Sequence, residues 1–406
     1  MVQESIPPIL RPESVRPVSL GDFAAKFELP VIGEGNGVSL TGISMNTGDL
    51  RPGDLFVAMP GKKTHGANFV AKAIELGAVA IVTDRAGSDL IENCSLPILL
   101  LENPRAHLGD LAAYVYGNVP GNMPKLFATT GTNGKTSTSY LLEGILRQLG
   151  ETTGLTSTAE RHIAGEIIVS RLTTPESPEM QALIARMREK GVTSVAVEVS
   201  AQALSQLRVD GMHFDVVGFT NLSHDHLDDY ADMQAYLEAK LPLFTKKRAV
   251  RGVVCLDTIY GKDFVKQTEE NRSQVERDSA KTLLRTPEIE LTLGKQLMGL
   301  MLTQQSEIPV VTITSRIGVD ADWHVGITAE TPAYTSFVLA GPNGINIRSR
   351  VPLLGAHMAA NAGLAIVMLI EAGFAAEQIQ AAILNGIDAY LPGRTERVTG
   401  ATGPDV

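Results

Sequence analysis

The chain has 406 residues, 44% hydrophobic and 20% charged, a globular composition with length for about two or three domains. Its net charge is −10 and it holds no dense Lys/Arg block, which excludes a surface built to bind the nucleic-acid backbone. Two cysteines, Cys94 and Cys255, are too few for a disulfide framework or metal cluster, and their apolar surroundings predict buried thiols. With no signal-peptide segment and no apolar run long enough to cross a bilayer, we expect a cytoplasmic monomer without a membrane span.

The first part of the chain alternates between strand and helix patterns. The proline-rich residues 1–18 are expected to form an extended lead. Apolar runs predict strands at 54–59, 79–82 and 96–101, with a helix at 69–76. This alternation is typical of a mostly parallel sheet. Residues 116–124 are rich in Gly, Pro and Asn and indicate a linker, so we place the first domain at 1–121.

A phosphate-binding loop is predicted where the second domain, 122–406, begins. A short apolar strand at 126–128 precedes a Gly-rich turn, and apolar residues at helical spacing follow up to position 149. The turn consists of Gly131, Thr132, Asn133, Gly134, Lys135 and Thr136. Glycines let backbone N–H groups face an anion, Lys can reach the β- and γ-phosphates, and the Thr hydroxyl can bind Mg²⁺. Thr129 replaces the first glycine of the strict pattern, so a glycine-rich turn that contains a lysine by chance remains an alternative interpretation.

Acidic and histidine residues lie near the carboxyl ends of two further predicted strands. Glu198 lies in the apolar strand 194–199, where a carboxylate is costly unless it is paired or binds metal. It is therefore either the second Mg²⁺ anchor of the loop or a salt-bridged structural residue. The strand 216–220 leads into a polar loop with His224 and His226, which could contact metal or phosphate or simply be solvated. No second His/Cys cluster lies at zinc-ligand spacing.

A helix predicted at 232–244 places Lys240 on its apolar face. Such a lysine extends to solvent, is paired, or is chemically altered. Strands are expected at 252–257 and 308–314, an antiparallel pair at 323–327 and 337–340, and helices at 357–372 and 376–384. The polar stretch at about 265–297 is interpreted as an inserted surface segment.

From about residue 38 the chain resembles the Mur ligase family, and within it the UDP-N-acetylmuramoyl-tripeptide synthetases. The resemblance rests on segments in the family's order: residues 51–58, the loop at 130–136, Thr173-Thr174-Pro175, Glu198-Val199-Ser200 and residues 221–228. It implies a small N-terminal α/β domain that binds a uridine nucleotide, then a central P-loop parallel-sheet ATPase domain. It further implies an ATP-dependent ligase of peptidoglycan precursor synthesis. That enzyme would add meso-diaminopimelate or L-lysine to UDP-MurNAc-L-Ala-D-Glu through an acyl phosphate.

The resemblance also implies residue roles. Lys135 would contact the transferred phosphate, Thr136 and Glu198 would hold Mg²⁺, and His226 would serve a second Mg²⁺. Lys240 matches a lysine that the family carbamylates. Asn361 and Arg394 match ATP contacts. The positions that match contacts to the muramyl nucleotide are Thr47, Thr173, Thr174, Ser200, Gln206 and Arg208.

The chain departs from the family's pattern in places. Ala201-Gln202 replaces Ser-His, Asn46-Thr47-Gly48 replaces Asp-Ser-Arg, and Met358 replaces an Asn. The family's third, Rossmann-like domain, which selects the incoming amino acid, is not recognised before position 406. We therefore expect weak nucleotide binding and little ligation from this chain alone. Two alternatives remain: a non-catalytic protein descended from a ligase that binds a nucleotide or UDP-sugar, and a folylpolyglutamate synthetase-like ligase. A GTPase is not favoured, because the sequence lacks the Asn-Lys-x-Asp motif that recognises guanine.

Overall fold

The computed structural model describes residues 9–223, 230–257, 306–352 and 355–392, which form two compact units. The first contains residues 9–124 together with 160–193 and 202–212, and the second contains 125–159, 194–201 and the described residues from 213 onward. The units thus interleave along the chain, whereas the sequence suggested a division into 1–121 and 122–406. The predicted insertion at 265–297 lies outside the described residues, as do His224, His226 and Arg394.

The first unit is built on a sheet of order β2-β7-β6-β5-β4, parallel except for the β2–β7 pair. Its strands are β2 (Val31–Ile32), β4 (Gly42–Ser44), β5 (Asp54–Ala58), β6 (Ala80–Thr83) and β7 (Ile98–Leu100). A small pair, β1 (Val18–Ser19) and β3 (Ser39–Leu40), and a hairpin, β10 (Glu160–Ile163) with β11 (Glu166–Val169), are antiparallel. The helices are α1 (Leu20–Lys26), α2 (Val70–Glu75), α3 (Arg85–Leu90), α4 (Pro104–Val115) and α6 (Ser177–Glu189), with 3₁₀ turns η1 (Thr47–Asp49) and η2 (Gly66–Phe69). The short helix α7 (Ala201–Ser205) begins at the last residue of a second-unit segment.

The helix α6 joins the first unit because it packs against α4. Ala182 and Ala185 of α6 belong to the same buried cluster as Leu108 and Leu111 of α4. Asn118 donates hydrogen bonds of 2.8 Å to the backbone carbonyl and the side-chain oxygen of Gln181. This packing brings residues that follow Thr174 into the unit that contains Thr47.

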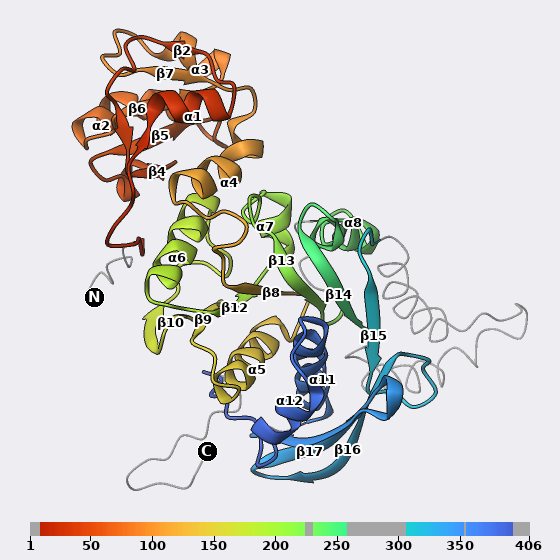
Figure 1. Cartoon of the computed structure of the whole chain (residues 1–406). Helices are drawn as coiled ribbons and strands as arrows, with labels where there is room; N and C mark the ends of the chain where they lie inside the picture. Colours follow the sequence, from red (N-terminus) through yellow and green to blue (C-terminus); the bar gives the residue numbers. More distant parts are fainter. Residues whose placement is uncertain (1–8, 224–229, 258–305, 353–354, 393–406) are drawn as a thin grey trace, which may run out of the picture. The chain divides into compact units, whose positions relative to one another are not determined.

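The second unit contains strands in the order β9-β12-β8-β13-β14-β15-β16-β17-β18. The part from β9 to β15 can be followed in Figure 1. The strands from β9 to β16 pair in parallel, and β16–β17 and β17–β18 are antiparallel. Their bounds are β8 (Lys125–Thr130), β9 (Thr153–Thr156), β12 (Ser194–Glu198), β13 (Phe214–Phe219), β14 (Ala249–Cys255), β15 (Val310–Thr314), β16 (Trp323–Thr331), β17 (Tyr334–Ala340) and β18 (Asn346–Val351). The predicted α/β architecture with a mostly parallel sheet is confirmed.

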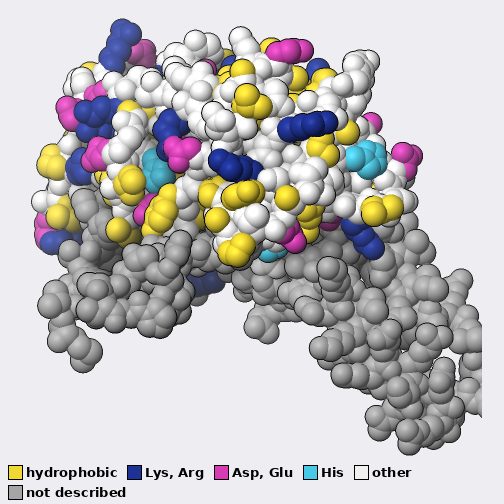
Figure 2. Space-filling model, turned by 90° about the horizontal axis from the view of Figure 1, so that it is seen from below, with side chains coloured by type: hydrophobic (Ala, Val, Ile, Leu, Met, Phe, Trp, Pro, Cys, Tyr) yellow, Lys and Arg dark blue, Asp and Glu magenta, His cyan; other side chains and the backbone are white. Residues whose placement is uncertain are grey.

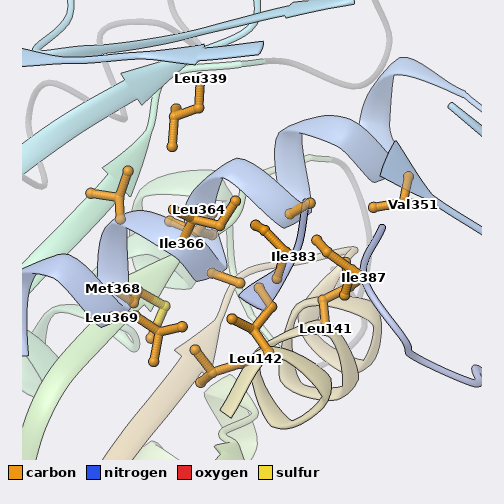
Figure 3. Close-up of a cluster of buried hydrophobic side chains, with 14 of the residues drawn as sticks. Leu141, Leu142, Leu339, Val351, Leu364, Ile366, Met368, Leu369, Ile383 and Ile387 are labelled. Atoms are coloured by element: carbon orange, nitrogen blue, oxygen red, sulfur yellow. The ribbon is translucent and has the colours of Figure 1, made fainter. Parts of the chain in front are cut away.

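The helices of the second unit are α5 (Lys135–Gln148), α8 (Met233–Glu238), α11 (Ala356–Glu371) and α12 (Ala376–Ala382), with 3₁₀ turns η3 (Leu241–Phe244) and η4 (Pro342–Gly344). Helix α11 packs against α5. Figure 3 shows Leu141 and Leu142 of α5 and Ile383 after α12 in one buried cluster with Leu364 and Ile366 of α11. This apolar core fixes α5, and with it the loop from which α5 begins.

The predicted continuous helix at 232–244 is wrong. Helix α8 ends at Glu238, and a separate 3₁₀ turn starts at Leu241. Pro242 has no backbone N–H, so it cannot donate the hydrogen bond that would continue the α-helical ladder. Lys240 therefore lies at the junction between the two helical pieces.

Cys255 is buried, as predicted, and burial raises the pKa of its thiol far above the usual range, whereas Cys94 is half-buried rather than buried. Among the described residues, no helix is both long and apolar enough to cross a membrane. On the face seen in Figure 2, basic and acidic side chains are interspersed rather than gathered by sign.

Candidate functional site

The predicted phosphate loop connects β8 to α5 and depends on two glycines. Gly131 has φ +146° and Gly134 has φ +86°, a backbone region that side chains rarely adopt. A Cβ atom on Gly131 would lie 2.0 Å from the Thr220 hydroxyl, and one on Gly134 would lie 2.8 Å from Oδ1 of Asn361. The loop therefore needs glycine for both its conformation and its close packing.

The residues just after β13 brace this loop. The backbone N–H of Thr132 donates to the Asn221 carbonyl at 2.9 Å, and that of Asn133 donates to Oδ1 of Asn221 at 3.1 Å. The Asn133 carbonyl in turn accepts bonds from the Thr220 hydroxyl at 2.6 Å and from Nδ2 of Asn221 at 2.8 Å. Thr220 and Asn221 therefore hold the loop in place, a role that the resemblance does not assign to them, although Asn221 lies in one of its motifs.

Lys135 begins α5 and folds back over the loop. Its Nζ donates to the carbonyl oxygens of Thr132 at 2.8 Å and Gly131 at 3.2 Å. The ammonium group thus lies among the loop's backbone groups, where it can offer positive charge to an anion bound by the loop. This is the arrangement expected for the lysine of a phosphate loop.

Thr136 and Glu198, two residues of the predicted metal set, come together near the carboxyl ends of β8 and β12. The Thr136 hydroxyl donates to Oε2 of Glu198 at 3.0 Å, and both residues are buried. Thr158 also donates to this carboxylate, from its N–H at 2.9 Å and its hydroxyl at 3.1 Å. Glu198 thus accepts hydrogen bonds from two hydroxyl groups and one backbone amide. A buried hydroxyl beside a carboxylate fits the oxygen ligands that Mg²⁺ prefers.

The side chain of Lys240 is fully buried, so the usual extension to solvent does not occur. Its Nζ lies 3.4 Å from the Gly131 carbonyl oxygen and 4.0 Å from the centroid of the Tyr236 ring. Burial, with a smaller contribution from the positive charge of Lys135, lowers the pKa of Lys240 well below its ordinary value. This lowered pKa favours the neutral form of the amine, which lies beside the phosphate loop.

The structure brings Asn361 to the same loop, from α11, where its side-chain oxygen faces Gly134. Of the predicted metal set, Thr136, Glu198 and Lys240 all border the loop, and His226 lies outside the described residues. Within those residues, no group of three or more His, Cys, Asp or Glu side chains could hold a metal ion. The described part of the predicted magnesium site thus depends on hydroxyl and carboxylate oxygens from separate elements.

The predicted substrate contacts divide between the units. Ser200 follows β12 in the second unit, whereas Thr47, Thr173, Thr174, Gln206 and Arg208 are in the first. Arg208 donates to Oε1 of Gln206 at 2.7 Å and to the Thr174 carbonyl at 3.3 Å, so these three residues form one group. Thr47 stands apart on η1 and lines a cavity of about 350 Å³.

That cavity lies at the carboxyl end of β5 and is lined by residues of β5, η1 and η2 and by Arg105 of α4. His65 shapes the η2 side, because its Nδ1 accepts the Ala67 N–H at 3.0 Å while Nε2 lies 3.1 Å from Oδ1 of Asp84. On the other side, Arg171 holds Asp49 of η1 at 2.9 Å. Hydrogen bonds and an ion pair within the first unit thus hold both sides of this cavity in place.

Comparison with known proteins gives matches along most of the chain. Residues 36–116 match the family model described as Mur ligase family, catalytic domain, and residues 129–309 match the Mur ligase middle domain. The UDP-N-acetylmuramyl-tripeptide synthetase of Leifsonia xyli subsp. xyli is 48% identical over 402 residues, which cover 98% of this chain and 71% of that protein. The UDP-N-acetylmuramoyl-L-alanyl-D-glutamate--2,6-diaminopimelate ligase of Streptomyces avermitilis is 39% identical, covering 88% of this chain and 63% of that protein.

A solved structure of a UDP-N-acetylmuramoyl-L-alanyl-D-glutamate--2,6-diaminopimelate ligase shares the fold, with a TM-score of 0.69 at 20% identity. The alignment covers 95% of this chain and 69% of that one. The chain belongs to the Mur ligase family. Its similar curated relatives carry the names of tripeptide synthetases and diaminopimelate ligases, and it spans about two thirds of their length.

Proposed function

We propose that this chain is the nucleotide-binding part of an ATP-dependent ligase that adds a diamino acid, meso-diaminopimelate or L-lysine, to UDP-MurNAc-L-Ala-D-Glu. The names of its relatives support this substrate, and the reaction belongs to peptidoglycan precursor synthesis. The observation that carries the proposal is the contact between Thr136 and Glu198 at 3.0 Å beneath a glycine-shaped loop. Such a site handles the phosphates of ATP rather than a neutral ligand. We further propose that the protein acts as a monomer in the cytoplasm.

The reaction joins two anions, the substrate carboxylate and the triphosphate of ATP. A carboxylate oxygen attacks the γ-phosphorus, the bond from that phosphorus to the β–γ bridging oxygen breaks, and ADP leaves. The amine of the incoming amino acid then attacks the acyl carbon, phosphate departs with its oxygen, and the amine loses a proton. Lys135 would neutralise charge on the transferred group, and the loop N–H groups would hold the β-phosphate.

Thr136 and Glu198 would hold one Mg²⁺, and His226 would serve a second. When bound, these ions supply positive charge between the attacking carboxylate and the phosphates. Asn361 and Arg394 would contact ATP. Thr158, which donates twice to Glu198, would orient that carboxylate.

Lys240 is proposed to be carbamylated. Its neutral amine attacks the carbon of CO₂, a nitrogen–carbon bond forms, and one C=O bond opens to place a negative charge on oxygen. The nitrogen then releases a proton to solvent. The reaction turns a lysine whose charged form is costly to bury into an anion that would face the metal ion at the loop.

The muramyl nucleotide would occupy the first unit, with the uridine end near Thr47 in the 350 Å³ cavity. The muramyl peptide and its diphosphate would lie at Thr173, Thr174, Gln206 and Arg208. Ser200, two residues after Glu198, would contact the same substrate. Isothermal titration calorimetry of substrate binding tests this proposal. We expect saturable binding of UDP-MurNAc-L-Ala-D-Glu and of Mg²⁺–ATP, and no binding of a pteroyl substrate. Binding of the pteroyl compound but not the muramyl nucleotide would favour the folylpolyglutamate synthetase-like alternative.

A further inference from the structure

Arg105, Glu176 and Arg208 form a continuous ion-paired row within the first unit. Nη1 of Arg105 donates to Oε2 of Glu176 at 2.6 Å, and Nε of Arg208 donates to Oε1 of the same carboxylate at 2.9 Å. Each oxygen of Glu176 therefore serves a different arginine. The three residues come from α4, the N-cap of α6 and the segment after α7, which are far apart in sequence.

One end of the row lies in the cavity that contains Thr47. Arg105 is the only charged side chain among the described residues that line this cavity. Its side chain lines the cavity and is 32% exposed. The bond to Glu176 uses Nη1, whereas a guanidinium carries five N–H donors in a planar fork. Arg105 thus retains donors that suit a phosphate group.

The other end of the row is Arg208, which contacts Gln206 and the Thr174 carbonyl. These are among the positions proposed to hold the muramyl peptide and its diphosphate. The row therefore runs from the pocket for the nucleoside to the group for the peptide. In a UDP-sugar, the diphosphate is the part that connects the nucleoside to the sugar.

The charges of the row fit an anion of that kind. Two guanidinium groups and one carboxylate leave a net charge of +1, while Glu176 keeps two like charges close together that would otherwise repel each other. Carboxylates such as Glu176 also gain stability at a helix N-terminus, here that of α6. The carboxylate is 23% exposed, so the pairing is partly shielded from solvent.

We propose that Arg105 binds the diphosphate of the uridine-nucleotide substrate and that Glu176 is a positioning residue that orients Arg105 and Arg208 together. This inference rests on the proposed function, because it assigns two further residues to the same substrate. Arg105 contacts the phosphates directly. Glu176 acts through the two arginines and does not touch the ligand.

Titration calorimetry with uridine, UDP and UDP-MurNAc-L-Ala-D-Glu tests the assignment. Since a charge-assisted hydrogen bond is lost, Arg105→Ala is expected to weaken UDP binding about tenfold or more and uridine binding less than about twofold. Arg105→Lys keeps the charge but not the fork and should restore part of the UDP affinity. Glu176→Gln should weaken UDP and the muramyl nucleotide while sparing uridine. Uridine binding also reports that each variant has a folded pocket.

Lys72→Ala is the matched control, because Lys72 forms an exposed ion pair with Glu75 at 2.9 Å in the same unit, and we expect it to bind all three ligands normally. Equal losses for uridine and UDP in Arg105→Ala, or no loss of UDP affinity, would overturn the assignment of Arg105. Unchanged affinity of the Glu176→Gln variant for UDP and for the muramyl nucleotide would overturn the positioning role of Glu176. If the unaltered chain binds neither UDP nor the muramyl nucleotide, the proposed function fails, and the inference fails with it.

Discussion

The hydroxyl of Thr136 donates a hydrogen bond of 3.0 Å to the carboxylate of Glu198, across 62 positions of sequence. The contact joins the first turn of α5 to the last residue of β12. Both side chains are buried, and Thr158 supplies two further hydrogen bonds to the same carboxylate. The contact places an oxygen-rich pair directly behind the phosphate loop, which is where a metal-assisted phosphoryl transfer needs it.

Neutralising Glu198 tests the metal role of this pair. In Glu198→Gln the negative charge is lost while the side-chain shape is kept, so Mg²⁺-dependent ATP affinity should fall at least about tenfold, as is common when a metal site is disturbed. ATP binding measured without Mg²⁺ should change little. Glu143→Gln is the control, because Glu143 is also buried and accepts a hydrogen bond, from Thr153 at 3.2 Å. Equal effects of the two substitutions would speak against a metal role for Glu198.

Two alanine substitutions can distinguish the role of glycine in the phosphate loop from the general effect of backbone strain on stability. Gly134 and Gly150 have φ values of +86° and +88°, so alanine is similarly strained at both, by about 1–2 kcal/mol. Only at Gly134 would the new Cβ meet a neighbour, Asn361, whereas nothing lies within 4 Å at Gly150. We expect both variants to lose similar stability in urea unfolding, apart from the added clash. Only Gly134→Ala should lose ATP affinity, and an equal loss in Gly150→Ala would contradict the loop's role.

Carbamylation of Lys240 predicts a direct spectroscopic signal. With ¹³C-bicarbonate, the unaltered protein should show a carbamate carbon resonance that is absent from Lys240→Met. Lys125→Met is a suitable control, since the Lys125 ammonium is exposed and contacts the Ala372 carbonyl at 3.3 Å. A carbamate signal that survives in Lys240→Met would place the modification elsewhere.

Lys240 also makes stability depend on pH in bicarbonate-free buffer. Burial lowers its folded pKa below the ordinary 10.5, so between these two values the unfolded chain binds more protons than the folded chain. The contribution of Lys240 to the free energy of unfolding therefore rises with pH across that window and is constant below it. Lys240→Met should be more stable than the unaltered protein at neutral pH, and the difference should shrink toward pH 10. A constant difference across this pH range would show that the amine does not titrate as proposed.

The lead of the chain is anchored through Arg11. Its guanidinium donates to both carboxylate oxygens of Asp54, at 2.6 and 2.8 Å, and to the Asp49 carbonyl at 2.9 Å. Because Asp54 is 1% exposed, Arg11→Ala leaves a buried charge unpaired and should cost about 3–5 kcal/mol in urea unfolding. Lys72→Ala, at an exposed pair, should cost about 0–1 kcal/mol. A loss below about 1 kcal/mol in Arg11→Ala would contradict the anchoring role.

Much of the fold follows from local patterns in the sequence. The predicted strands at 54–59, 194–199 and 216–220 correspond to β5, β12 and β13, and the loop and helix after β8 lie where expected. The alternation of Ile347, Ser349 and Val351 with exposed residues could have revealed β18, which the sequence analysis omits. The break before η3 could likewise be read from Pro242.

The remaining features depend on contacts that no local pattern contains. Arg11 meets Asp54 across 43 positions, and Glu176 meets Arg105 across 71. A single Arg in a proline-rich lead or a single Glu before a helix looks like an ordinary surface residue. Their partners are chosen by the packing of α4, α6 and the first sheet, so the structure is needed to find them.

The central claim is tested most directly by phosphate release from ATP. The chain should be assayed alone and joined to the remaining length of the Leifsonia relative, of which it covers 71%. We predict that the joined protein releases phosphate only when UDP-MurNAc-L-Ala-D-Glu and a diamino acid are both present, and that Lys135→Ala abolishes the release. Release that needs no muramyl nucleotide, or that needs a pteroyl substrate instead, would contradict the account.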